Sequence, residues 1–265
     1  MHPGRPVGDS SERRVMLEGP ATRSEEIAMT DCLRGGTFVV MGSGHFATLR
    51  QSLPRLGYLL SQLEPTYHLD TVAQIDAAFL KELEVAGVLW DVDGTLMTYH
   101  GRDVDDQFPH IRNLFRSGPA RHAILSNCDE ARFEKLGELF PEVHVLRGYT
   151  TADGLVFRHR LGGEDTHTVD EVNRILSDGG GQIRKPSREL VEYGRQVLRV
   201  DEPHSLLMVG DQYLTDIASA NLAGTRSVKV RTFGRETFPR QIRLSQRMEN
   251  LLYSALYRHR HSAVR

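Results

Sequence analysis

The chain has 265 residues, of which 39% are hydrophobic and 26% are charged, and its formal net charge is −2. This length and composition are typical of one sizeable folded domain with appendages, and the small net charge gives no indication of nucleic-acid binding. Its two cysteines, Cys32 and Cys128, are too few for a disulfide framework, which fits a reducing compartment. No apolar run approaches the ~20 residues that span a bilayer, and the start of the chain lacks the apolar core of a signal peptide. We therefore expect a cytoplasmic protein without a nucleic-acid partner.

Two segments precede the main pattern of the chain. Residues 1–34 are polar and charged with few apolar side chains, which predicts a disordered tail. Residues 35–84 are predicted to form a helical extension, because leucines recur at helical spacing from Leu49 to Leu63 and a further helix is indicated over 72–83.

From residue 85 onward, short apolar runs alternate with helical patterns. The predicted strands lie at 88–90, 123–125, 143–146, 206–209 and 227–230, and the predicted helices at about 105–117, 129–140, 187–199 and 214–223. Such alternation predicts an α/β fold with a Rossmann-like, doubly wound parallel sheet over residues 85–239. An insertion at about 154–183 interrupts the pattern with a short strand at 155–157 and a polar stretch.

The final segment, residues 240–265, is predicted to be a basic amphipathic helix. It carries six arginines and one acid, Glu249, beside leucines at helical spacing. Two placements are open for this helix. It lies on an anionic membrane surface, or it packs its leucines on the domain and leaves its arginines in solvent.

Two aspartates, Asp91 and Asp93, follow the predicted strand at 88–90 directly. Because side chains alternate along extended backbone, these two carboxylates point to the same side. The carboxyl ends of parallel strands are where open α/β sheets bind their ligands. The alternative is a strand that ends in an ordinary Asp-Gly turn.

Three more polar groups lie at or beyond predicted strand ends. They are Ser126-Asn127, Lys185-Pro186-Ser187, and Gly210-Asp211 with Asp216. Each has a structural alternative: a helix N-cap, a solvated loop lysine, and a turn followed by a charged helix face. Because all of them converge on one edge of the predicted sheet, we favour a shared catalytic site.

The residue types at this edge suit phosphoryl transfer. A carboxylate attacks phosphorus, and a second carboxyl group protonates the leaving oxygen and then activates water. Clustered carboxylates repel one another unless a hard cation lies among them, and Mg²⁺ prefers oxygen ligands. A hydroxyl and a lysine then offset the charge on the phosphoryl oxygens.

The set Asp91-x-Asp93-Gly94-Thr95, Ser126, Lys185 and Gly210-Asp211-x-x-x-x-Asp216 resembles the haloacid dehalogenase (HAD) superfamily, over about residues 85–232. The resemblance implies that Asp91 is the nucleophile and Asp93 the general acid and base. It implies phosphate binding by Ser126, Asn127, Lys185 and Thr95, and a Mg²⁺ site made by Asp91, Asp93 through its backbone carbonyl, Asp211 and Asp216. An acid at position 93 favours a phosphatase over the dehalogenases of the superfamily.

The motifs Lys185-Pro186 and Gly210–Asp216 also resemble the class III, YqeG-type branch, which is similar to phosphatidylglycerophosphate phosphatases. Few residues separate Asp93 from Ser126, which leaves no room for a large cap domain between them. The chain differs from that branch at Gly94, where asparagine is usual. The resemblance implies a Mg²⁺-dependent phosphomonoester hydrolase acting on phosphatidylglycerophosphate or a similar anionic phosphate. The alternatives are a phosphatase of soluble sugar phosphates or nucleotides, and an idle HAD domain that binds another protein.

Overall fold

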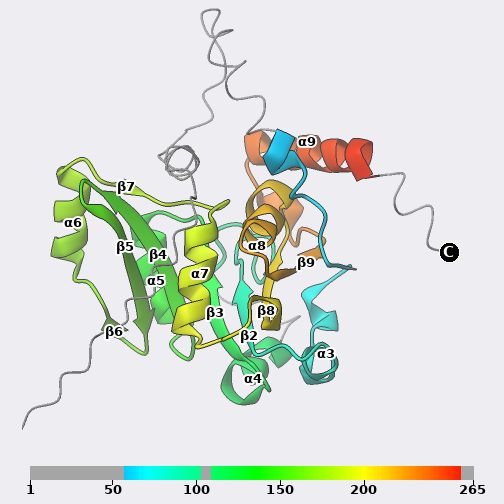
Figure 1. Ribbon diagram of the computed structural model, residues 1–265, viewed down its shortest axis with the longest axis horizontal. Helices are drawn as coiled ribbons and strands as arrows, with labels where there is room; N and C mark the ends of the chain where they lie inside the picture. Colours follow the sequence, from blue (N-terminus) through cyan, green and yellow to red (C-terminus); the bar gives the residue numbers. More distant parts are fainter. Residues whose placement is uncertain (1–56, 103–108, 258–265) are drawn as a thin grey trace, which may run out of the picture. The chain divides into compact units, whose positions relative to one another are not determined.

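The computed structural model describes residues 57–102 and 109–257, which are built around one mixed sheet (Figure 1). The strands follow the order β1-β9-β8-β2-β3-β4-β5-β6, and β7 pairs with β4. Neighbouring strands from β1 to β4 are parallel, whereas the pairs that involve β5, β6 and β7 are antiparallel. The predicted α/β fold is confirmed, and the sheet is mixed rather than wholly parallel.

The centre of the sheet consists of five strands. They are Gly87–Trp90 (β2), Arg121–Leu125 (β3), His144–Thr151 (β4), Leu206–Gly210 (β8) and Arg226–Val230 (β9). Strand β2 lies between β3 and β8, with Trp90 beside Ile124 and Val209. This register brings the residues that follow β2, β3 and β8 to the same edge of the sheet.

Helices cover both faces of the central strands. They are Pro109–Ser117 (α4) and Glu130–Leu139 (α5) on one face, and Arg188–Val197 (α7) and Ala218–Leu222 (α8) on the other. Successive residues of β2 point to opposite faces of the sheet. Trp90 packs in the core under α4 and α5, and Leu89 packs in the core under α7 and α8. Burial on both faces explains why β2 and β8 are apolar throughout instead of alternating with polar residues.

The insertion forms an extension of the sheet. It consists of Gly154–Leu161 (β5), Glu164–Asp165 (β6), Val169–Ser177 (α6) and Gly181–Gln182 (β7). The strand predicted at 155–157 is therefore longer, and a helix occupies part of the predicted polar stretch. The buried Arg158 joins the insertion to α5, since its guanidinium lies 2.6 Å from carboxylate oxygens of both Asp165 and Glu134.

Residues 57–86, which precede β2, are only partly helical, and this corrects the predicted helical extension over those residues. The rest of the predicted extension, residues 35–56, lies outside the described residues. Residues 57–60 are helical, but Tyr67–Leu69 (β1) is a strand that pairs with β9. The helix predicted over 72–83 is divided into a 3₁₀ turn, Val72–Gln74 (η1), and a helix, Ala77–Glu82 (α3). The division follows from Asp76, which caps α3 by accepting a hydrogen bond from the Phe79 N–H at 2.8 Å. The predicted tail, residues 1–34, lies outside the described residues.

The C-terminal part of the described chain contains the helix Arg240–Tyr257 (α9), where the basic helix is predicted. Its packed face differs from the leucine face, because the buried residues are Gln246, Glu249, Tyr253 and Tyr257. Three single-turn elements complete the fold: Pro203–Ser205 (η2), the π-helical turn Tyr213–Ile217 (η3) and Arg235–Thr237 (η4). Within residues 57–102 and 109–257, no helix has the length and apolarity that crossing a membrane requires.

Candidate active site

The loop after β2 holds Asp91 at the edge of the sheet. The Asp91 N–H donates a hydrogen bond to the Val209 carbonyl at 2.9 Å, so the backbone of Asp91 continues the pairing of β2 with β8. The chain then turns at Gly94, whose φ is +89°, and a Cβ there would lie 2.8 Å from an oxygen of Asp211. Both the backbone conformation and this close approach require glycine. The buried Thr95 hydroxyl lies 3.3 Å from Asp91 Oδ2.

Lys185 reaches the same edge from the loop that precedes α7. Its buried ammonium group donates to Asp91 Oδ1 at 2.6 Å, to Asp216 Oδ1 at 2.7 Å and to the Leu125 carbonyl at 2.7 Å. All three donors of the lysine are therefore engaged. Lys185 is a buried member of the site, which excludes the alternative of a solvated loop lysine.

Asp211 and Asp216 are positioned by the segment that follows β8. Asp211 comes directly after the strand, and Asp216 lies on η3, where its Oδ2 accepts a hydrogen bond from the Gln212 N–H at 3.0 Å. A Cβ on Gly210 would overlap the Asp216 carboxylate. Glycine at position 210 thus allows η3 to fold back against the end of β8.

Asp91, Asp211 and Asp216 form a buried carboxylate cluster. Each offers an oxygen within 4.8 Å of the others. With one lysine among three carboxylates, the fully ionised cluster has a charge of −2. Asp211 Oδ1 is buried and has no hydrogen-bond partner among the described residues. A hard divalent cation such as Mg²⁺ fits this donor set, because it would balance the charge and use the free oxygen.

Burial has the largest effect on the pKa values of the cluster, and neighbouring charges have the next largest. Burial raises the pKa of Asp91 to about 7, with Lys185 lowering it and Asp216 raising it. Burial and the charges of Asp91 and Asp216 also raise the pKa of Asp211 well above its usual value. Burial alone would lower the pKa of Lys185, but Asp216 and Asp91 raise it above its usual value. A divalent cation bound among these carboxylates would favour their charged forms.

Asp93 has a different environment from Asp91. Its carboxylate lies 3.0 Å from a guanidinium nitrogen of Arg132, and its Oδ1 accepts a hydrogen bond from the His100 N–H at 3.1 Å. The structure thus gives Asp93 side-chain partners outside the buried cluster. The predicted metal contact through its backbone carbonyl stays a prediction. Arg132 is itself buried on α5 and also donates to the Gly101 carbonyl at 2.6 Å. Sequence reasoning missed Arg132.

Ser126 and Asn127 follow β3 at the same edge. The neighbouring Leu125 carbonyl accepts a hydrogen bond from Lys185, so this strand end adjoins the cluster. The Asn127 amide bonds to both backbone groups of Lys185, accepting from its N–H at 2.7 Å and donating to its carbonyl at 2.9 Å. Asn127 thus holds the lysine loop in place. Phosphate binding by Ser126, Asn127 and Thr95 stays a prediction.

Helix α9 contributes two further polar side chains that sequence reasoning did not assign to the site. Gln246 donates a hydrogen bond to Asp211 Oδ2 at 3.2 Å. Glu249 accepts hydrogen bonds from the backbone N–H groups of Tyr213 and Leu214 at 3.1 and 3.5 Å, at the start of η3. The one feature of the sequence that could have indicated a role for this helix at the site is Glu249, a lone acid among arginines.

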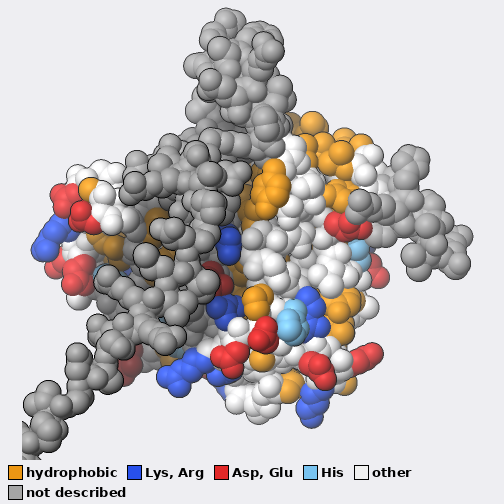
Figure 2. Space-filling model, in the orientation of Figure 1, with side chains coloured by type: hydrophobic (Ala, Val, Ile, Leu, Met, Phe, Trp, Pro, Cys, Tyr) orange, Lys and Arg blue, Asp and Glu red, His pale blue; other side chains and the backbone are white. Residues whose placement is uncertain are grey.

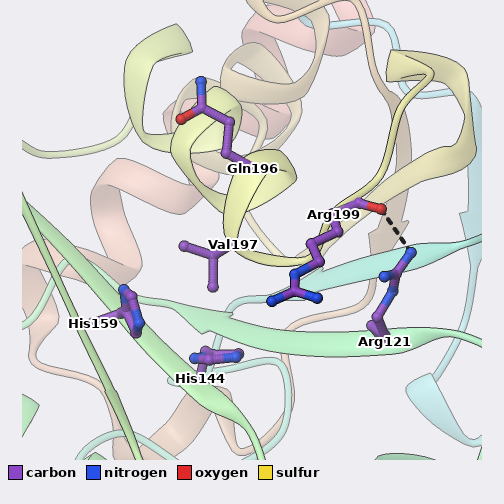
Figure 3. Close-up of a pocket in the computed structure, with 6 residues that line it drawn as sticks. All are labelled: Arg121, His144, His159, Gln196, Val197 and Arg199. Atoms are coloured by element: carbon purple, nitrogen blue, oxygen red, sulfur yellow. Dashed lines mark hydrogen bonds between the residues drawn. The ribbon is translucent and has the colours of Figure 1, made fainter. Parts of the chain in front are cut away.

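A hollow with different chemistry lies away from the aspartates (Figure 3). Its lining residues are Arg121, His144, His159, Gln196, Val197 and Arg199. Arg121 and His144 are the first residues of β3 and β4, so the hollow lies at the edge opposite the strands' carboxyl ends. None of the six lining residues carries a carboxylate, and the hollow has no part in the predicted chemistry.

Comparison with known proteins gives one family match. A family model described as HAD-hydrolase-like matches residues 182–240, which are about a fifth of the chain. A D-galactonate dehydratase family member from Catenulispora acidiphila is 28% identical over 89 residues, or 32% of this chain and 21% of that protein. The chain therefore spans about a fifth of the length of this relative.

Two solved structures show only weak likeness. One is an uncharacterized protein from Listeria monocytogenes serotype 4b, with 17% identity and a TM-score of 0.34 over 54% of this chain and 76% of that chain. The other is the N-terminally truncated, IMP-bound IMP-nucleotidase of Plasmodium falciparum, with 11% identity and a TM-score of 0.34 over 85% and 79%. Neither is close enough to argue from. The residues matched by the family model include Lys185, Asp211 and Asp216, and the last two belong to the carboxylate cluster.

Proposed function

We propose that this protein is a Mg²⁺-dependent phosphatase that hydrolyses phosphomonoesters through an aspartyl-phosphate intermediate. The observation that carries the proposal is the position of Asp91, a buried carboxylate 2.6 Å from the Lys185 ammonium and clustered with Asp211 and Asp216. A nucleophilic carboxylate and the phosphoryl group that it attacks are both negatively charged and repel each other. The positive charge of Lys185 reduces this repulsion. The HAD-hydrolase-like match over 182–240 gives independent support.

The reaction has two steps. In the first, an Asp91 oxygen bonds to phosphorus, the bond to the leaving oxygen breaks, and Asp93 gives a proton to that oxygen. In the second, Asp93 takes a proton from water, the water oxygen bonds to phosphorus, and the bond to Asp91 breaks. Lys185 offsets charge on the phosphoryl oxygens in both steps. Mg²⁺ held by Asp91, Asp211 and Asp216 would supply further charge neutralisation.

The substrate proposed first is phosphatidylglycerophosphate or a related anionic lipid phosphate, and a soluble sugar phosphate or nucleotide is the alternative. A phosphate-release screen over all three classes with Mg²⁺ distinguishes them. A folded protein that releases phosphate from none of these substrates would favour the idle domain that binds another protein.

Replacing the proposed nucleophile gives the decisive test. Asp91→Asn should reduce Mg²⁺-dependent hydrolysis of p-nitrophenyl phosphate by at least ~10³-fold, as loss of a nucleophile does in other covalent enzymes. Asp153→Asn, which removes an exposed acid from the turn before β5, is the matched control and should retain activity. In the unaltered protein, acid quenching should trap a hydroxylamine-sensitive acyl phosphate, and EDTA should abolish turnover until Mg²⁺ is restored. Full turnover by Asp91→Asn contradicts the assignment.

A further inference from the structure

The side of helix α9 that faces inward is opposite to Leu244, Met248 and Leu251, whereas Leu252 packs against a core cluster. Its buried residues, Gln246, Glu249 and Tyr253, recur at intervals of three and four and so form one face. Leu244, Met248 and Leu251 recur at the same intervals on the opposite face, where they are 60%, 60% and 65% exposed. Packing on the domain, which was one of the two placements left open by the sequence, therefore does not account for this leucine face.

The exposed apolar side chains of the described residues are concentrated on α9. Of the eight exposed large hydrophobic side chains among the described residues, four lie on this helix: Leu244, Met248, Leu251 and Leu256. Figure 2 shows hydrophobic side chains gathered over α9. Isolated exposed leucines are ordinary on a protein surface, whereas a contiguous apolar patch marks an interaction site.

The charges of α9 indicate what the patch contacts. Arg240, Arg243 and Arg247 lie on the flank of the apolar stripe in the first half of the helix. The single acid in the helix, Glu249, is only 5% exposed and is turned inward to the backbone of η3. The outer surface of α9 within residues 240–257 thus combines an apolar stripe with positive charge and carries no exposed carboxylate. This combination is complementary to an anionic lipid surface.

We propose that α9 docks the protein on anionic lipid bilayers, lying in the plane of the interface with Leu244, Met248 and Leu251 toward the acyl chains. The inner face of the same helix bonds to Asp211 and to the start of η3. The carboxylate cluster therefore lies about one helix diameter, ~10 Å, from the lipid-facing stripe. A lipid phosphomonoester as substrate rests on the proposed phosphatase function, whereas the docking itself does not.

Co-sedimentation of the full chain with vesicles tests the docking. We expect binding to vesicles of equal parts phosphatidylglycerol and phosphatidylcholine, and weaker binding to phosphatidylcholine alone or at high salt. The double variant Met248→Asp/Leu251→Asp should bind at least ~10-fold more weakly, because it loses apolar burial at the interface. The control Leu155→Asp changes an exposed leucine of the insertion in the same way and should bind as the unaltered chain does.

A second pair of variants tests the charge argument. Arg240→Gln/Arg247→Gln should weaken binding to the anionic vesicles by about fivefold for each arginine. Arg174→Gln/Arg188→Gln, which removes the same charge from α6 and α7, should have little effect. Circular dichroism spectra and thermal melting of every variant check that the fold is retained.

Three results would overturn the proposal. They are no sedimentation of the unaltered chain with anionic vesicles, undiminished binding by Met248→Asp/Leu251→Asp, and a dimer in solution that this double variant dissociates without any vesicle binding. The last result would assign the patch to a second copy of the chain. Asp91→Asn keeps the docking test separate from catalysis, since it should lose turnover and bind vesicles normally.

Discussion

Asp91 and Asp93 are two residues apart and have the same chemistry, yet the fold gives them different surroundings. Asp91 is buried beside Lys185, and burial raises its pKa to about 7. Asp93 is partly open to solvent and is held by Arg132 and by the His100 N–H. The first environment suits a nucleophile that must lie close to a phosphoryl group. The second suits a proton carrier that must be oriented and still reach water.

Arg132 is a positioning residue for Asp93, and removing it tests this role. Arg132→Met should lower kcat by roughly 10- to 100-fold, within the range that general acid–base catalysis contributes. The loss should be larger for an alkyl phosphate than for p-nitrophenyl phosphate, because a poor leaving group depends more on an oriented acid. Steady-state kinetics on both substrates measure the difference. Arg112→Met, on α4, is the control, and equal losses on the two substrates would indicate a structural role only.

Several of the site residues that the sequence predicts directly follow strands. Asp91, Ser126 and Asp211 each come directly after an apolar run, so the rule that parallel strands end at one edge is enough to group them. Arg132 and Gln246 lie on helices whose patterns report only which faces are apolar. Their contacts with Asp93 and Asp211 depend on how those helices pack on the sheet, which a local pattern does not contain.

At the scale of elements, η3 and α9 are joined by hydrogen bonds and by aromatic stacking. The first N–H groups of a helix lack partners within the helix, and here Glu249 accepts hydrogen bonds from two of them. Tyr213 of η3 also stacks on Tyr253 of α9, with ring centroids 4.1 Å apart. The sequence leaves open whether the C-terminal helix packs on the domain, and these contacts make α9 part of the support for Asp211 and Asp216.

Weakening this support should affect metal affinity more than phosphate chemistry. Gln246→Ala removes the hydrogen bond to Asp211, and we expect the Mg²⁺ concentration for half-maximal activity to rise by roughly 10- to 100-fold, as it does when partners of metal ligands are lost. Activity at saturating Mg²⁺ should recover most of its original value. A Mg²⁺ titration of p-nitrophenyl phosphate hydrolysis measures both quantities. The neighbouring exposed residue offers the control Ser245→Ala, and an unchanged titration for Gln246→Ala would contradict the role.

At the scale of the whole molecule, local patterns predict the parallel core but only a small part of the strands added to it. The core strands are buried apolar runs separated by helices, which is a strong signal. Strand β1 has only three residues, and its identity depends on pairing Tyr67 with Val228, far away in the sequence. Likewise, β5 pairs with β4 over seven residue pairs from Val145↔Arg160 to Thr151↔Gly154. The sequence predicts only residues 155–157 of this strand, because from Arg158 onward it is polar and is held against α5 by ion pairs to Glu130 and Glu134.

His122 makes the stability of the whole fold depend on pH. It is buried on β3, where it accepts a hydrogen bond from Trp90 Nε1 at 3.2 Å, and burial lowers its pKa to about 4. Below the unfolded value of 6.5, the unfolded chain binds a proton that the folded chain does not. Stability from this group is therefore full above pH 6.5 and falls as the pH drops toward 4. Between pH 7.5 and pH 5, the free energy of unfolding should fall by about 2 kcal/mol more in the unaltered protein than in His122→Gln. Urea unfolding at both pH values measures this difference, with the exposed-site variant His204→Gln as control. If the unaltered protein and His122→Gln lose the same stability over this interval, another group carries the pH dependence.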